Sequence, residues 1–187
     1  MKKVLVFGMT DNPGGMESVI MNYYRHIDRS VLQFEFLCNT EKVAYEDEIR
    51  KLGGVIHNIC ARSKNLKQYK HDMTEFFKNN AEKYCALWFN TCSLSNIDYL
   101  VYATKYHIPK RIIHCHNAAN GGDSFLRNLL HKYHQRKVFK YATDFWTCNQ
   151  DSDLWFFGKS SKELPNYRVI YNAIDLDYFA PNDEIRK

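Results

Sequence analysis

Two adjacent glycines and one histidine-bearing segment are the residues of this 187-residue chain with the clearest chemical use. Gly14 and Gly15 follow the apolar run Val4–Phe7 and precede apolar residues at helical spacing, so we expect them where a strand leads into a helix. Backbone N–H groups at a helix start lack intrahelical partners, and the helix dipole makes this end positive. Such a corner can bind a phosphate without a charged side chain. A Pro-Gly-Gly turn without a ligand is the alternative interpretation.

Two histidines lie near the end of a second apolar segment, Arg111–Asn117. His114 and His116 are two positions apart, so both side chains are expected on the same face of a strand. His114 lies deeper in the strand, and we interpret it as a core residue. His116 lies at the strand end beside Asn117, where a neutral imidazole can exchange a hydrogen bond with a sugar hydroxyl. His116 is therefore the candidate catalytic residue.

Two other apolar segments also end in asparagines, Asn90 and Asn149. In a parallel sheet the carboxyl ends of the strands share one edge, and ligands bind outside that edge. We therefore expect a substrate or donor-phosphate site there. Its candidate residues are Gly14, Gly15, Asn90, Asn117 and Asn149.

The elements that would position these residues alternate along the chain. Strands are expected over residues 4–7, 33–38, 54–59, 85–90, 111–116, 144–148 and 167–171. Helices are expected over residues 16–27, 44–52, 66–80, 94–106, 124–141 (the longest) and 151–157. This alternation predicts an α/β fold, a Rossmann-like doubly wound, mainly parallel sheet with helices on both faces. Residues 1–172 form the predicted domain, and residues 173–187 read as the start of a linker.

Composition limits the classes of function. The chain is 45% hydrophobic with a net charge of +5, which is compatible with phosphate-bearing ligands or an anionic surface. It has no dense basic block or nucleic-acid-binding motif, so no nucleic-acid partner is expected. Six cysteines without paired Cys or His spacing predict core thiols in a reducing compartment and no metal site. We read the N-terminus as a strand rather than a signal peptide and expect a cytoplasmic protein without a membrane span.

The expected helix over 124–141 is rich in basic residues. They are Arg127, Lys132, Arg136, Lys137 and Lys140, with leucines and aromatic residues between them. A solvated face of an ordinary amphipathic helix is the simpler interpretation. The alternative is a peripheral contact with anionic lipid headgroups on the inner face of the cell membrane.

Four segments, taken in order, resemble the N-terminal half of glycosyltransferase family 4 enzymes, which have the GT-B fold. They are Pro13–Glu17, Ile113–Asn117, Thr147–Ser152 and Val169–Phe179. The resemblance is strongest to bacterial enzymes that build capsular polysaccharides or exopolysaccharides, and the last segment is the most specific. In that segment Ala173 replaces the family's usual glycine, which makes a left-handed backbone less favourable.

The resemblance implies a retaining transferase in polysaccharide biosynthesis with two Rossmann-like domains facing across a cleft. The first domain holds a saccharide or lipid-linked acceptor, and the second holds a nucleotide-sugar donor. Gly14 and Gly15 would approach the donor diphosphate, and His116 would contact the transferred sugar. The family needs no metal and no other cofactor, because charges and helix N-termini in the second domain balance the phosphates.

The second domain's Arg, Lys and glutamate pair would lie beyond Lys187. The resemblance therefore implies the acceptor half of an enzyme, inactive alone, whose C-terminal GT-B domain follows in cis or is a separate chain. One alternative is a non-catalytic acceptor-binding or membrane-recruiting subunit of a split transferase. Another, an NAD-binding dehydrogenase domain, is disfavoured because the G-x-G-x-x-G fingerprint is missing.

Overall fold

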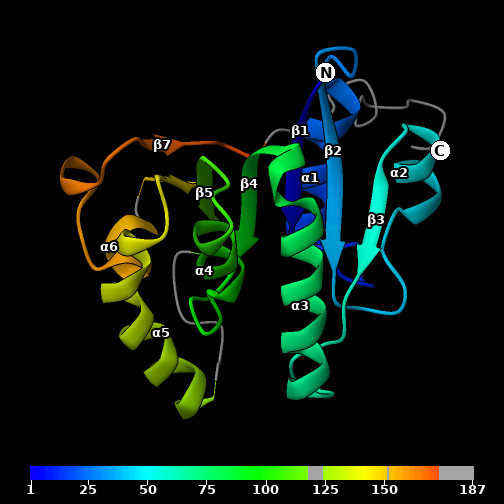
Figure 1. The fold of residues 1–187 in the computed structure, drawn as a ribbon. Coiled ribbons are helices and arrows are strands. Elements are labelled where there is room, and N and C mark those ends of the chain that lie inside the picture. The colour runs from blue at the N-terminus through cyan, green and yellow to red at the C-terminus, as the bar shows by residue number, and fades with distance from the viewer. Residues whose placement is uncertain (118–123, 151, 173–187) are drawn as a thin grey trace, which may run out of the picture.

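A computed structural model describes residues 1–117, 124–150 and 152–172, so residues 173–187, the expected linker, lie outside the described residues. One sheet of seven parallel strands forms the centre, in the order β3-β2-β1-β4-β5-β6-β7 (Figure 1). The strands are β1 Lys2–Phe7, β2 Leu32–Cys38, β3 Val55–Asn58, β4 Tyr84–Thr91, β5 Lys110–Cys115, β6 Asp144–Thr147 and β7 Tyr167–Val169. Every strand pair is parallel, as the alternation of strands and helices predicts.

Helices connect the strands. They are α1 Gly15–His26, α2 Glu46–Lys51, α3 Leu66–Asn80, α4 Asp98–Lys105, α5 Phe125–Lys137 and α6 Ser152–Phe157. Short 3-10 turns span Ala81–Lys83, Val138–Lys140 and Ser161–Glu163. The predicted fold class is confirmed: the chain is an α/β protein with a Rossmann-like, doubly wound parallel sheet.

Each face of the sheet has its own core. On one face, α1 and α2 pack residues such as Ile20 and Ile49 against the inward side chains of β1 and β2. On the other face, α3, α4 and α6 contribute residues such as Met73, Leu100 and Phe156. The division of the helices between the two faces follows from the topology. Right-handed crossovers place the helices on opposite faces when the strand order reverses between β3 and β4.

Helix α4 begins at Asp98, four residues later than the predicted start. Side-chain hydrogen bonds hold the preceding segment in a loop instead. The backbone N–H of Leu94 donates to His131 Nδ1 over 3.1 Å, and Asn96 Oδ1 accepts from the Asp98 N–H over 2.9 Å. Asparagine favours such turns over a helix interior, which periodicity alone does not reveal.

Helix α5 is also shorter than predicted, and it is not the longest helix. It has 13 residues against 15 in α3. After Lys137 the chain tightens into a 3-10 turn that buries Val138 in the core, and the Tyr141 N–H donates to the Val138 carbonyl. The apolar pattern continues through this turn, so the sequence alone did not mark the helix end.

Candidate functional site

The candidate site lies at the carboxyl edge of the three central strands. β1, β4 and β5 are neighbours in the sheet, and Gly8, Asn90 and His116 lie at or just beyond their carboxyl ends. Helix α1 starts at the same edge, with Gly14 at its N-cap position and Gly15 as its first residue. The fold therefore brings the glycine pair, Asn90 and His116 to the same edge of the sheet, as predicted.

His116 is held by the asparagine of the neighbouring strand. Its Nε2 lies 2.9 Å from Asn90 Oδ1. Its backbone N–H donates to the carbonyl of Thr91 over 3.1 Å, which continues the β4–β5 ladder by one residue. Both the ring and the backbone of His116 are thus fixed by β4.

The Asn90 amide determines which His116 ring nitrogen carries the proton. Asn90 is fully buried, and its Nδ2 donates to the carbonyls of Phe7 and Trp88 over 3.1 and 3.3 Å. Two carbonyl acceptors require the NH₂ group on that side, so Oδ1 must face the imidazole and accept a hydrogen bond from its N–H. Nε2 therefore carries the hydrogen, and the lone pair of the neutral ring is on Nδ1.

Burial keeps this imidazole uncharged. Desolvation lowers the pKa of His116 to about 4, so the ring is neutral near pH 7. No hydrogen bond to Nδ1 occurs among the described residues. The ring can therefore accept a hydrogen bond from a hydroxyl group at this edge.

His114 has the buried environment expected of a core residue. It is fully buried, packs against Trp88 with ring centroids 5.9 Å apart, and lies 4.3 Å from the His116 ring. Burial, and secondarily the neighbouring His116, lowers its pKa to about 3, while the nearby Ile170 backbone opposes this shift. Neither ring nitrogen reaches hydrogen-bond geometry with a described residue. His114 is therefore a neutral ring beneath His116.

Gly8 allows β1 to approach Asn90 closely. Its φ is +132°, and a Cβ at this position would lie only 2.7 Å from Asn90 Cβ and 3.1 Å from Ile20 Cδ1. Any larger residue would push β1 away from the asparagine that holds His116. Gly8 was not among the residues predicted to have a role in the site. A glycine directly after a buried strand was the available signal.

Gly14 and Gly15 at the start of α1, which we call the glycine corner, differ in the space around them. A Cβ at Gly14 would lie 2.9 Å from Glu17 Oε2, whereas a Cβ at Gly15 would meet nothing within 4 Å. Glu17 is buried, and its Oε1 accepts from Thr10 Oγ1 over 2.6 Å. The helix start thus already holds a carboxylate beside Gly14 and leaves space for a ligand beside Gly15.

The remaining asparagines have local roles. The carbonyl of Asn117 accepts from the buried Cys115 thiol over 3.0 Å. Asn149 Oδ1 accepts from Ser152 Oγ over 2.7 Å at the start of α6. Neither contact joins its asparagine to His116, so a substrate role for Asn117 and Asn149 stays a prediction.

The basic residues of the predicted lipid-facing helix are all exposed. Arg127, Lys132, Arg136 and Lys137 lie on α5, and Lys140 lies on the following 3-10 turn. Within the described ranges, no helix is long and apolar enough to cross a bilayer. In the same residues, no group of three or more His, Cys, Asp or Glu side chains is arranged to hold a metal ion.

Comparisons with known proteins relate the chain to glycosyltransferases. It is 30% identical, over 186 residues, to the Bacillus subtilis (strain 168) protein named "Putative glycosyltransferase EpsF". The match covers 98% of this chain and 48% of that protein, so the chain spans about half the length of this curated relative. No family model matches the chain.

Two solved structures share the fold. Acinetobacter baumannii MurG superimposes with a TM-score of 0.60 at 13% identity, over 100% of this chain and 48% of that chain. The apo form of the lipopolysaccharide outer core galactosyltransferase WaaB superimposes with a TM-score of 0.59 at 14% identity, over 94% and 47% of the two chains. The chain is therefore homologous to a protein named as a glycosyltransferase and has the Rossmann-like fold of about half of a GT-B enzyme.

Proposed function

We propose that this chain is the acceptor-side, N-terminal domain of a retaining glycosyltransferase in polysaccharide biosynthesis. A nucleotide sugar would be the donor, and a saccharide or a lipid-linked saccharide the acceptor. The relationship to EpsF, of which the chain matches about half, supports this function. The observation that carries it is the neutral His116 ring fixed by Asn90 at the carboxyl edge.

His116 would act through its Nδ1 lone pair. Because Asn90 Oδ1 accepts a hydrogen bond from Nε2–H, Nδ1 keeps its lone pair, which would accept a hydrogen bond from a hydroxyl of the transferred sugar and orient it. Gly15 would let the donor diphosphate approach the start of α1 from its open side. The donor half, in cis or as a separate chain, would supply the remaining phosphate contacts without a metal or other cofactor.

The test joins the chain to its donor half and measures transfer from nucleotide sugars to saccharide acceptors. Activity should require both halves. His116→Ala should lower kcat/KM about a hundredfold, the lower range for loss of a group that exchanges a proton or hydrogen bond in the reaction. His71→Ala, which removes an exposed histidine on α3, is the matched control and should leave activity unchanged.

Two results would contradict parts of this proposal. Full activity in His116→Ala would remove the catalytic assignment. No transfer by the joined halves, with acceptor binding retained, would instead favour a non-catalytic acceptor-binding or membrane-recruiting subunit. The exposed surface of α5 is the observation that favours this second candidate.

A further inference from the structure

An apolar groove crosses the sheet on the face that packs against α1. Its volume is about 280 Å³, and its walls are apolar and aromatic side chains. They come from β1, β2, β4, β5 and β6, from α1 and from the residue after β7, and they include Tyr23, Phe34, Trp88, Ile112, Trp146 and Ile170. The groove therefore extends across the strands rather than along them.

The helices on this face leave part of the sheet uncovered. In the part of the chain that the structure describes, α1 and α2 contribute to the core here, whereas α3, α4 and α6 contribute to the core of the opposite face. Helix α1 meets the middle of the sheet at Tyr23, whose ring centroid lies 6.0 Å from that of Trp88. Nearer to β7, Trp146 and Ile170 are only half-buried. An open apolar surface of this kind is typical of a site that a further segment or partner covers.

The chain itself leads to this groove. Ile170 lines it, and the carbonyl of the next residue, Tyr171, accepts from the Tyr23 hydroxyl over 3.3 Å. Asn172 is the last residue that the structure describes. Residues 173–187 therefore continue from the rim of the groove, which makes them the nearest candidate occupant.

The sequence after Asn172 has the pattern of an extended segment with one apolar side. Ile174, Leu176 and Tyr178 alternate with two aspartates, Asp175 and Asp177. In an extended backbone, successive side chains point to opposite sides. The three apolar side chains can therefore face the groove while both carboxylates stay in water, so that no unpaired charge is buried.

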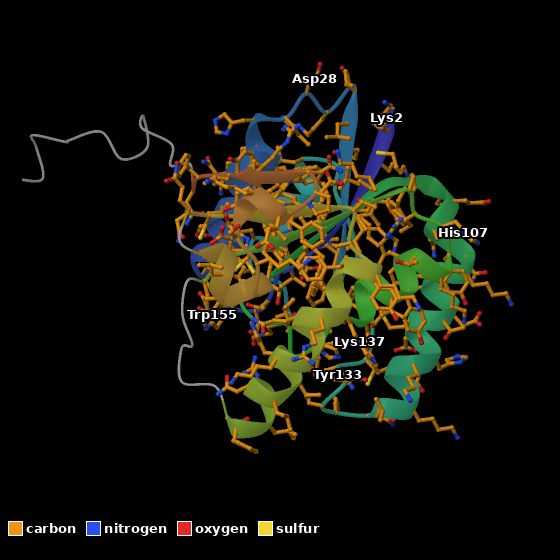
Figure 2. All side chains as sticks on the ribbon, turned by 90° about the vertical axis from the view of Figure 1, so that its left-hand side faces the viewer. Lys2, Asp28, His107, Tyr133, Lys137 and Trp155 are labelled. Atoms are coloured by element: carbon orange, nitrogen blue, oxygen red, sulfur yellow. The ribbon has the colours of Figure 1, made fainter. Side chains whose placement is uncertain are left out.

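The length of this segment matches the width of the groove. In the sheet, β2 lies five strand positions from β7, which corresponds to about 24 Å at about 4.8 Å per step. Residues 173–179, if extended, span about 23 Å at about 3.3 Å per residue. The groove ends at β2 beside the turn after α1, where the Leu32 N–H donates to the Asp28 carbonyl over 2.9 Å. Figure 2 labels Asp28 in this turn, at the same end of the molecule as Lys2.

We propose that residues 173–179 dock in this groove as an extended segment, with Ile174, Leu176 and Tyr178 against the apolar side chains of the sheet. The docked segment crosses from β7 to β2 and covers the open part of the α1 face. It also fixes the point at which the chain leaves this domain. This inference does not rest on the proposed function, because it involves no substrate and no reaction.

Photo-cross-linking tests the docking. The photoreactive residue p-benzoylphenylalanine is placed at position 178 instead of Tyr178, and the cross-linked peptides are identified by mass spectrometry after irradiation. Cross-links should form within one chain, to peptides that contain groove residues such as Val4 or Phe34. The same photoreactive residue in place of Asp177 is the matched control. It lies on the opposite side of the extended segment and should give few of these cross-links.

Substitutions in the segment measure the apolar contribution to docking. Ile174→Ser with Leu176→Ser should lower the yield of groove cross-links from position 178 severalfold, since burial of each apolar side chain strengthens docking about tenfold or more. Asp175→Ser with Asp177→Ser is the matched control. It changes the side that faces water and should leave the yield unchanged.

Three results would overturn the proposal. Cross-links spread over the whole surface, or equal from positions 177 and 178, would show that the segment does not occupy the groove. Cross-links between two chains would assign the groove to a second copy. Loss of the groove cross-links once the donor half is joined would assign the groove to that half. Sugar transfer is not part of these measurements, so its success or failure tests the proposed function separately.

Discussion

At the scale of single residues, the candidate site depends on how Asn90 is oriented. Its amide makes three hydrogen bonds, one of which positions His116, and a substrate contact by Asn90 stays a prediction. The sequence placed both residues at the same sheet edge. It did not predict their contact, because their side-chain pairing depends on the β4–β5 register. The tautomer of His116 depends on that contact in turn.

Substitution of Gly8 should test this arrangement through stability. Gly8→Ala should lower the free energy of unfolding by about 1–3 kcal/mol, because the new Cβ clashes with Asn90 and φ is positive. Gly15→Ala is the matched control. It should leave stability unchanged or raise it by up to about 1 kcal/mol, since the position is open and helical. Equal thermal stability of Gly8→Ala and wild type would contradict this account of the β1–β4 approach.

The fully buried His114 and the half-buried His116 should make the protein sensitive to acid. Their folded pKa values, about 3 and about 4, lie below the ordinary value of 6.5. The unfolded chain therefore binds more protons, and stability should fall as pH falls from about 6.5 towards about 4. His114→Leu removes one buried group that lacks a described partner, so it should flatten this dependence while changing stability at pH 7 by less than about 1 kcal/mol. Denaturant unfolding between pH 5 and pH 7 measures how steeply the free energy of unfolding changes with pH. If this slope is the same in His114→Leu and in the wild type, His114 does not have the lowered pKa described here.

At the scale of elements, one buried carboxylate joins four strands of the sheet. Glu35 on β2 contacts Lys3 on β1 over 2.6 Å, His57 on β3 over 2.8 Å and Tyr84 on β4 over 2.7 Å. Burial opposes its ionisation, but the hydrogen bonds from Lys3, His57 and Tyr84 together outweigh burial and lower its pKa to about 2.

Loss of this carboxylate should destabilise the sheet. Glu35→Gln should lower the free energy of unfolding by about 1–3 kcal/mol, because three partners lose a charged acceptor in a buried site. Glu41→Gln breaks the exposed pair with Lys64 and should have little effect. Urea unfolding measures the free energy of unfolding of both variants. A similar loss of stability in the two would show that burial does not strengthen the Glu35 contacts.

The elements also show how far the sequence predicts the fold. Long apolar runs such as Cys85–Asn90 identified the central strands, because buried parallel strands have a simple hydrophobic pattern. Helix ends were less predictable, since side-chain hydrogen bonds at Leu94 and Asn96 replace a helical turn. The basic residues of α5 were predicted to face outward. Exposure of Phe125 and Leu129 was not, because an apolar residue in a helix ordinarily predicts a core contact.

At the scale of the whole molecule, the chain spans about half the length of the proteins it matches, so the phosphate contact proposed at Gly14 and Gly15 would be one part of a larger site. The buried carboxylate of Glu17 already lies beside the positive end of α1. A diphosphate at Gly15 would therefore gain from backbone N–H groups and lose through repulsion by this carboxylate. Under the proposed function, tight donor binding would therefore depend on positive charges of the donor half.

Calorimetric titration with nucleoside diphosphates measures how far diphosphate affinity depends on the donor half and on Glu17. The isolated chain should bind with a Kd of about 1 mM or weaker, which corresponds to only about 4 kcal/mol. Joining the donor half should tighten binding by several orders of magnitude, while Glu17→Gln should strengthen binding to the isolated chain by removing the repulsion. If the isolated chain binds a nucleoside diphosphate with micromolar affinity, or if Glu17→Gln does not raise the affinity, the Glu17 carboxylate does not limit diphosphate binding at the glycine corner. The donor contacts would then have to lie elsewhere on the carboxyl edge.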